Sequence, residues 1–460
     1  MHRIIASLAA LLLSLGVVNA QESGGPSGSG AAEPTTPTLE QLGDSVRELE
    51  ERTTRNEDDL ARLKAIRISG YVQSEWQHFD QTTSAGGRAL YSDSRKNLFT
   101  IRRGRIKVQH RLGDVMSYAI QTDVTEAGVS IKDAFISMSL LPRDGLRLDA
   151  GMFNRPNFEV ELSSSAREAT ERSQVVRAFY PGERDLGVMV SSRPELAAGF
   201  APRLQLGIFN GPGTSREVDA IKDIAARVSV PVPLGERSPV AFDLGGSFYY
   251  GGIPQTGARV IEFADGAADT VDNAETGGMA GFGNNRNIGV ESQIRLELLP
   301  IGATVLRGEL LSGQRATAGS PSTPATVGMV RTSDGRDSIR VTAGTPATPL
   351  VIRRQMGYYV YLVQNLGDDL QFVARYDFFD RNTDLAGAEV PSAGEAASSV
   401  LGIGLNYTWE KIRLTLYYEM PRFAADEAIQ IDPSTRRAID AMRNEDAKDN
   451  KTTLRLQYRF

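Results

Sequence analysis

The chain has 460 residues, a formal net charge of −6 at pH 7, no cysteine and only three histidines. Without cysteine it can form no disulfide and no thiolate metal site. The histidines that follow the N-terminal segment, His78 and His110, have no ligand spacing, which argues against a metal site or a histidine-dependent nucleophile. We therefore expect no cofactor and no metal, and nothing in the composition suggests a nucleic-acid partner.

Residues 1–20 have the pattern of a secretory signal peptide. A short basic start precedes the apolar run Ile4–Val18, and Ala20 ends a small-residue cleavage site. The run is shorter than the roughly 20 apolar residues of a membrane-spanning helix. A flexible Gly/Ser/Pro/Thr linker is expected over 21–37. No later segment is long and apolar enough for a transmembrane helix, so the sequence predicts either a soluble exported protein or a β-barrel.

Residues 38–65 carry a heptad pattern. Apolar positions recur three and four residues apart from Leu39 to Leu63, and Thr53 and Asn56 weaken the middle of the series. This spacing predicts a periplasmic α-helical coiled coil. Because so short a helix is marginal alone, it implies association or docking. The alternative is a single amphipathic helix on a surface, and we favour self-association.

From Ile66 onward the hydrophobic period changes to two, which predicts β-strands with one apolar and one polar face. The predicted strands number sixteen, an even count typical of bacterial barrels. They are Ile66–Phe79, Leu98–Arg111, Val115–Val124, Ile131–Leu141, Leu146–Phe153, Arg184–Ser192, Arg203–Phe209, Asp223–Pro231, Val240–Tyr250, Asn287–Leu299, Ala303–Leu311, Gln355–Leu366, Asp369–Phe379, Val400–Trp409, Lys411–Met420 and Thr452–Phe460.

The connections between these strands alternate in length. Tight turns such as 112–114 and 367–368 alternate with long polar segments such as Asn154–Glu183 and Ser312–Arg354. Short turns at one end and long loops at the other are typical of porins, with the short turns periplasmic. The predicted fold is an all-β, 16-stranded antiparallel transmembrane β-barrel over 66–460, with both of its ends on the periplasmic side.

The last strand supports the same fold. Leu454, Leu456, Tyr458 and Phe460 alternate with polar residues, and the sequence stops on the aromatic ring. Outer-membrane barrels turn such an apolar face to lipid and the polar face to the lumen. The predicted location is the outer membrane of a Gram-negative cell.

The second predicted strand has an unusual polar face. Arg103, Arg105, Lys107 and Arg111 share it, spaced about 6.6 Å apart along the strand. Such a row fits a water-filled lumen that passes anions, because guanidinium groups offer forked donors to oxyanions. The alternative is a neutralised ladder in which acids on neighbouring strands, such as Asp123, pair with the row.

Several motifs, taken in order and spacing, resemble the phosphate-selective porin O/P family over 66–460. They are Phe99–Arg105, Lys132–Phe135, Gly151–Pro156, Glu171–Arg172, Arg184–Val188, Phe209–Gly211, Arg375–Asp377 and Gly404–Tyr407. The resemblance implies a trimer of 16-stranded barrels with an arginine ladder and a third loop, here 154–183, folded into the lumen. The long loop, its charges of both signs and a predicted helix over Ser165–Ala178 fit that expectation.

The resemblance and the strand faces together define a predicted substrate path. Its ladder residues are Arg102, Arg103 and Arg105 with Lys107, Asp123 and Lys132, and its loop residues are Arg155, Glu159, Ser164 and Arg172. The predicted function is passive diffusion of small anions, phosphate or similar oxyanions, and the predicted protein is not an enzyme. Expected partners are small anions, outer-membrane lipid, two further copies of the chain in a homotrimer, and the barrel-assembly machinery.

Two alternatives stay open at this point. The first is a general or weakly selective porin whose N-terminal coil tethers the outer membrane to the cell wall. The second is an outer-membrane hydrolase, for which His78 is the candidate histidine at the outer rim.

Overall fold

The computed structural model divides into two units, one ending at Leu63 and one starting at Lys64. It describes residues 39–80, 97–141, 145–156, 164–180, 182–196, 200–217, 219–232, 234, 238–254, 259–264, 267–272, 282–317, 326–331, 337–342, 350–386, 397–423 and 450–460. The predicted signal peptide and linker lie outside these residues. Neither helix in the described part is both long and apolar enough to span a membrane.

The N-terminal unit contains one helix, α2, over Leu39–Lys64. Two ion pairs lie on its surface, Asp44 with Arg47 and Glu51 with Arg55, and the two members of each pair are one helical turn apart. Val46 and Leu49 of the heptad series are 51% and 57% exposed. The predicted helix is present, and its predicted self-association stays a prediction.

The C-terminal unit is built on sixteen long strands. They are β1 (Ile66–Phe79), β2 (Asn97–Leu112), β3 (Met116–Thr125), β4 (Gly128–Leu141), β5 (Leu146–Asn154), β6 (Arg184–Ser192), β7 (Arg203–Phe209), β8 (Asp223–Val232), β9 (Val240–Pro254), β12 (Phe282–Leu296), β13 (Thr304–Thr317), β16 (Val351–Leu366), β17 (Leu370–Asp380), β18 (Ser398–Trp409), β19 (Ile412–Phe423) and β20 (Lys451–Arg459).

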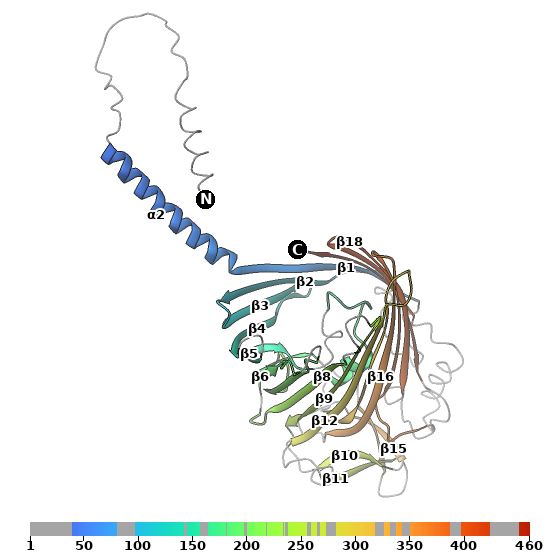
Figure 1. The fold of residues 1–460 in the computed structure, drawn as a ribbon. Coiled ribbons are helices and arrows are strands. Elements are labelled where there is room, and N and C mark those ends of the chain that lie inside the picture. Colours follow the sequence, from blue (N-terminus) through green and yellow to red (C-terminus); the bar gives the residue numbers. More distant parts are fainter. Residues whose placement is uncertain are drawn as a thin grey trace, which may run out of the picture. The chain divides into compact units, whose positions relative to one another are not determined.

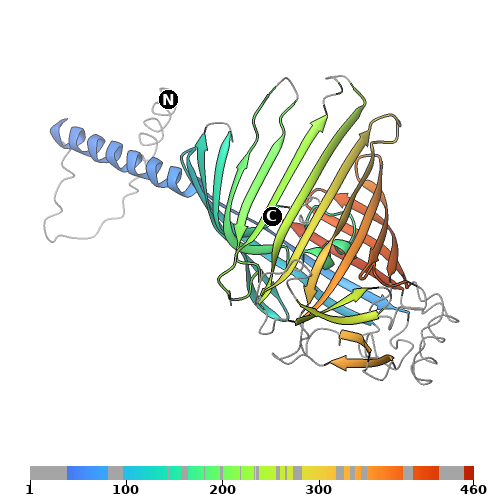
Figure 2. The same ribbon diagram turned by 90° about the horizontal axis from the view of Figure 1, so that it is seen from below.

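These strands close into an antiparallel barrel. Each pairs with the next along the chain, β9 with β12 and β13 with β16, and β20 pairs with β1 from Tyr71↔Arg459 to Phe79↔Lys451. Figure 1 shows β1 beside the C-terminal strands, and Figure 2 shows the tilted strands side by side. The predicted 16-stranded antiparallel fold is confirmed. Most predicted strand ends lie within two or three residues of the observed ones.

Two predicted loops contain strands of their own, which the sequence analysis missed. The segment after β9 forms the hairpin β10 (Arg259–Ala264) and β11 (Ala267–Asp272), and the segment after β13 forms β14 (Thr326–Arg331) and β15 (Asp337–Thr342). Figure 2 shows both hairpins beyond one end of the barrel. Strand β10 pairs in parallel with the start of β16, where Val260 and Phe263 are buried. Each strand of these hairpins is only six residues long, so the hairpins lack the length signal of the wall strands. Val260 of β10 packs on Ala316 and Ile352 of the barrel wall.

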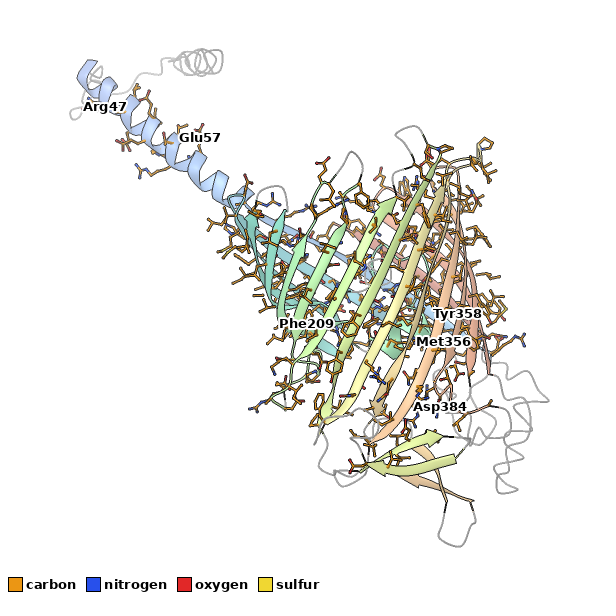
Figure 3. All side chains as sticks on the ribbon, turned by 60° about the horizontal axis from the view of Figure 1, so that its bottom comes forward. Arg47, Glu57, Phe209, Met356, Tyr358 and Asp384 are labelled. Carbon is orange, nitrogen blue, oxygen red and sulfur yellow. The ribbon has the colours of Figure 1, made fainter. Side chains whose placement is uncertain are left out.

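The outer wall is apolar and the inner wall is polar. On β19, Leu414 and Leu416 are 42% and 49% exposed, whereas Thr415 and Tyr417 are buried inside. Figure 3 labels Met356 and Tyr358 on β16, and the ring of Tyr358 stacks on outward Phe378 with centroids 5.4 Å apart. A closed barrel leaves no backbone edge unpaired, and a ring of exposed apolar and aromatic side chains fits lipid. The protein is a transmembrane β-barrel of the outer-membrane type.

Candidate functional site

We refer to the segment between β5 and β6, residues 155–183, as the inner loop. Its described residues, 155–156, 164–180 and 182–183, bond side chains of the inner wall of the barrel. At Ser164 its hydroxyl contacts the Tyr71 hydroxyl and accepts a 2.8 Å hydrogen bond from Nη1 of Arg105. The Ser164 carbonyl accepts from Nε2 of Gln73 at 3.2 Å. Because Tyr71, Gln73 and Arg105 are buried side chains of β1 and β2, these bonds fix this part of the loop against the inner wall.

The adjoining wall, from β20 round to β13, holds the inner loop by its backbone. Arginines of four inward-facing strand surfaces donate hydrogen bonds to loop carbonyl oxygens, and we refer to these five as the carbonyl clamps. The pairs are Arg459 with Ser165, Arg413 with Ala166, Arg455 with Thr170, Arg375 with Glu171 and Arg315 with Ala178. The loop thereby lies along the inner wall formed by β13 and β17–β20.

The carboxylate of Glu171 is the centre of the strongest side-chain anchor. It accepts hydrogen bonds from Nε and Nη2 of Arg102 at 2.6 and 2.8 Å, and it lies 3.5 Å from guanidinium nitrogens of Arg103 and of Arg455. Burial opposes ionisation of Glu171. The hydrogen bond from Arg102 and the positive charges of Arg103, Arg102 and Arg455 outweigh it and hold the carboxyl pKa well below its usual range.

The helix predicted over Ser165–Ala178 is wrong in its extent. The structure has only α4, Gln174–Phe179, with the Ser173 hydroxyl accepting from the amide of Val176 at its N-terminus. The carbonyls of Thr170 and Glu171 accept charge-assisted hydrogen bonds from wall arginines, which compete with helical i to i+4 bonds. The apolar face of α4 packs on the inner wall, where the Phe179 ring lies 6.1 Å from that of Phe379.

Arg102 and Arg103 lie side by side at a β-bulge. Gln73 pairs with Arg103 while the next residue, Ser74, pairs with Ile101, so Arg102 is left over in β2. The bulge lets both side chains reach Glu171, although strict alternation would place them on opposite faces. Arg103 also donates to Oε1 of Gln73 at 2.9 Å and is only 3% exposed.

The other predicted ladder residues have different surroundings. Nε of Arg105 lies 3.3 Å from Oδ2 of Asp123, so this arginine is paired with a carboxylate as well as bonded to Ser164. Lys132 sits at a second bulge, since Gln121 pairs with Asp133 and Thr122 with Ile131. Lys107 is partly exposed and pairs with no acid among the residues that the structure describes.

The predicted loop residues are spread over the base of the inner loop. Arg155 lies at its start, 3.7 Å from Oδ2 of Asp185, and Arg172 pairs with Glu183 near its end. Burial opposes ionisation of Glu183, but the charges of Arg172, Arg184 and Arg105 lower its pKa. Glu159 lies outside the described residues.

A cavity of about 350 Å³ lies between the inner loop and the wall from β1 to β8. Seven basic side chains line it, Arg105, Lys107, Arg147, Arg155, Arg184, Arg203 and Arg227, against two acidic ones, Asp133 and Asp149. The carboxylates that pair with Arg105, Arg155 and Arg227, on Asp123, Asp185 and Glu291, do not line it. A solute in this cavity therefore meets mainly cations.

Sequence reasoning missed four of these cations: Arg147, Arg184, Arg203 and Arg227. Arg147 is more accessible than Arg184 and Arg227, with 37% of its side chain exposed and Nη2 at 3.0 Å from Asp149. Each of the four stands on the inward face of its strand. Assigning the inward face of every predicted strand, including the fifth to the eighth, would have found them.

A second recess, of about 300 Å³, lies on the other side of the inner loop near the short turns. Four acids line it, Glu168, Asp368, Asp369 and Glu410, with Lys411, Arg413 and Arg459. Its charges are thus nearly balanced, unlike those of the larger cavity. The inner loop separates a strongly basic side of the lumen from a mixed one.

The described residues contain no cluster of three or more His, Asp or Glu side chains that could hold a metal. His78 contacts Asn97 through Nδ1 at 2.7 Å and lies 3.8 Å from Asp80. No serine hydroxyl of the described residues bonds to it. This surrounding differs from the nucleophile and base pair that a hydrolase requires.

No protein-family model matches the sequence, so the resemblance to the phosphate-selective porins stays a prediction. No curated protein matches it either. Among solved structures, the chain is similar to an anion-selective porin of Comamonas acidovorans, with 12% identity, a TM-score of 0.48 and coverage of 86% of this chain and 99% of that one. It is also similar to the outer membrane channel DcaP of Acinetobacter baumannii, with 11% identity, a TM-score of 0.48 and coverage of 86% and 97%. A third is the trimer form of the outer membrane protein OmpT of Vibrio cholerae, with 9% identity, a TM-score of 0.47 and coverage of 86% and 99%.

Proposed function

We propose that the protein is an outer-membrane porin through which small anions diffuse passively, with the cavity beside the inner loop as part of their path. The observation that supports this most directly is the excess of seven basic over two acidic side chains around that cavity. Fixed cations in a confined passage raise the local concentration of anions and lower that of cations. Phosphate or similar oxyanions suit the forked donors of the arginines.

The cations divide into two groups within this proposal. Arg102 and Arg103 hold Glu171, so we assign them to anchoring the inner loop. Lys107 and Arg147 are more accessible and face the cavity, so we assign them to contact with passing anions. Arg105 has both roles, since it bonds Ser164 and lines the cavity.

The test is the reversal potential of single channels in planar bilayers under a gradient of potassium chloride and then of potassium phosphate. The wild-type channel should favour anions. A unit charge about 5 Å away changes the energy of a monovalent ion by roughly 0.8 kcal/mol in water. Lys107→Glu changes the charge by two units, which raises the energy of a nearby anion by roughly 1.7 kcal/mol and lowers that of a cation by as much. Without salt screening, the anion-to-cation permeability ratio should therefore fall by about two orders of magnitude.

The matched control is Arg111→Glu. Arg111 lies on the same strand, four residues further toward the short turn, is exposed, and does not line the cavity. It should change the ratio much less than Lys107→Glu. Equal effects of the two variants, or a wild-type channel without anion preference, would contradict the proposal. Either result would favour a general porin whose N-terminal helix α2 tethers the outer membrane to the cell wall.

We also propose that the barrel works as a homotrimer inserted by the barrel-assembly machinery. The exposed apolar outer wall supports contact with lipid or with neighbouring barrels. The exposed Val46 and Leu49 of α2 support contact between the helices of separate chains. An enzymatic role has no comparable support, because His78 bonds only Asn97 and pairs with Asp80 among the described residues.

A further inference from the structure

The inner wall from β4 to β7 carries a strip of aromatic rings beside the basic cavity. The ring of Phe153 lies edge-on to those of Phe135 and Phe209, with centroids 5.7 Å apart in both pairs. Phe209 is labelled in Figure 3. Phe135, Phe153 and Met189 line the cavity; Phe135 is partly exposed, and Phe153 and Met189 are each 5% exposed. Phe209, only 1% exposed, lies behind them. The porin function proposed above makes no use of this apolar surface.

Glycines on the same wall make room for the strip. Phe135, Gly151, Gly187 and Phe209 are paired in one row across β4, β5, β6 and β7. A Cβ atom at Gly187 would lie 2.6 Å from a ring carbon of Phe209, and one at Gly207 would lie 2.5 Å from another. Only glycine allows the Phe209 ring to lie against the wall here. The strip is therefore built into three strands and does not depend on one side chain.

Cations stand at both ends of the strip. Arg155, which follows β5, and Arg184, which begins β6, lie at the end of the strip nearer the long loops. Arg147 and Arg203, which lie near the starts of β5 and β7, are nearer the short turns. Lys107 lines the same cavity from β2. A solute in the cavity can thus place an apolar body on the rings and a charged group on a cation at the same time. An inorganic anion would gain nothing from the rings.

We propose that the preferred solutes of this path are carboxylates with a flat apolar body, such as arylcarboxylates. This inference rests on the proposed anion-porin function and narrows its substrate class. A ring on the Phe135–Phe153 strip gains edge-to-face contacts and burial. A carboxylate gains a charge-assisted hydrogen bond from Arg147, whose side chain is 37% exposed and which holds Asp149 through Nε and Nη2. The cavity volume of about 350 Å³ lies at the small end of ligand sites, which suits a single aromatic ring.

The experiment compares sodium benzoate, acetate and phosphate as blockers of chloride current through single wild-type channels in planar bilayers. Benzoate should bind about 3- to 10-fold more tightly than acetate, the range expected for an aromatic pair beyond simple burial. Phe153→Leu should remove most of this difference. The control is Phe248→Leu, since Phe248 faces outward and is 44% exposed.

The outcomes separate the two proposals. A wild-type channel that prefers anions but binds benzoate and acetate equally would overturn the aromatic preference and leave the porin proposal standing. A channel without anion preference would remove the porin proposal itself. If Phe153→Leu does not assemble, Phe135→Leu takes its place, and the comparison of the three anions on the wild-type channel decides in either case. Phosphate that binds more tightly than benzoate would also overturn the inference.

Discussion

Replacing Glu171 by Gln is expected to loosen the inner loop without unfolding the barrel. The change keeps the size of the side chain and removes its charge, and Arg102, Arg103 and Arg455 then lose the carboxylate that neutralises them. Like charges that are held close together repel one another. The loop keeps its carbonyl clamps, so we expect partial detachment instead of loss of the fold.

The size of the effect follows from burial. Breaking a buried ion pair by removing one partner costs about 3–5 kcal/mol. Because the Arg102 side chain is 38% exposed, the lower end, about 3 kcal/mol, applies here. Since each 1.4 kcal/mol is a factor of ten, the population with a detached loop should rise roughly a hundredfold.

Single-channel recording at constant voltage is the assay. The Glu171→Gln channel should show frequent transitions to a larger conductance, and its unfolding temperature should change little. Glu297→Gln is the matched control, because Glu297 pairs with Arg295 at the short-turn end and both side chains are at least half exposed. A folded Glu171→Gln channel with the conductance and noise of the wild type would show that Glu171 does not hold the loop.

Three further predictions concern pH, assembly and association. Glu171 and Glu183 have lowered pKa values, so their ion pairs with arginine are fully formed above the ordinary glutamate pKa of about 4.3. These ion pairs are lost only as the pH falls through the lowered values. Single-channel conductance recorded from pH 7 to 5 should therefore not change. The backbone of Phe460 bonds that of Gly70 at 3.1 and 3.2 Å and completes the β20–β1 seam. Deleting Phe460 should therefore lower the amount of protein at the cell surface more than it lowers the stability of finished barrels. Equal surface levels of the deletion variant and the wild type would contradict this prediction. Deleting 39–65 should weaken a trimer detected by cross-linking, and a full-length chain that cross-links only as a monomer would rule the trimer out.

The barrel could be predicted from sequence because its signal is repeated in every strand. Alternation on β19 and β20 separates an outward set such as Leu416 from an inward set such as Thr415, and the structure has the same separation. One face meets lipid and the other meets water, so a shift of register by one residue would expose a whole row of charges to lipid. That constraint is why most strand ends were also close to their observed positions.

The immediate surroundings of the candidate site could not be predicted in the same way. The bulges at Arg102 and Lys132 interrupt the alternation, and a single extra residue leaves no pattern in the sequence. Arg102 was assigned to the ladder from the family resemblance, whereas its contact with Glu171 depends on the bulge. The partners Asp123 and Glu171 lie 18 and 69 residues from the arginines that they bond.

The helix prediction for the inner loop was wrong in extent for a different reason. Residues 165–178 have the composition of a helix, but only the segment from Gln174 on is helical. Helix propensity is a weak preference that tertiary contacts override. Here the wall offers charged donors to the carbonyls of Thr170 and Glu171, and charge-assisted hydrogen bonds are stronger than those of a helical turn.

The carbonyl clamps bear on selectivity as well as on the shape of the loop. An arginine that is paired with a carboxylate adds less to the positive field of the lumen than one that bonds a carbonyl oxygen, which keeps its full positive charge. Arg315, Arg413 and Arg459 bond carbonyls and form no ion pair with a carboxylate among the described residues. The same side chains that fix the loop therefore add to the positive field that the cations of the larger cavity create. For this reason the number of arginines does not show how many of them anchor the loop and how many select anions. A substitution at a carbonyl clamp should change conductance and anion preference together, whereas Lys107→Glu should change the anion preference alone.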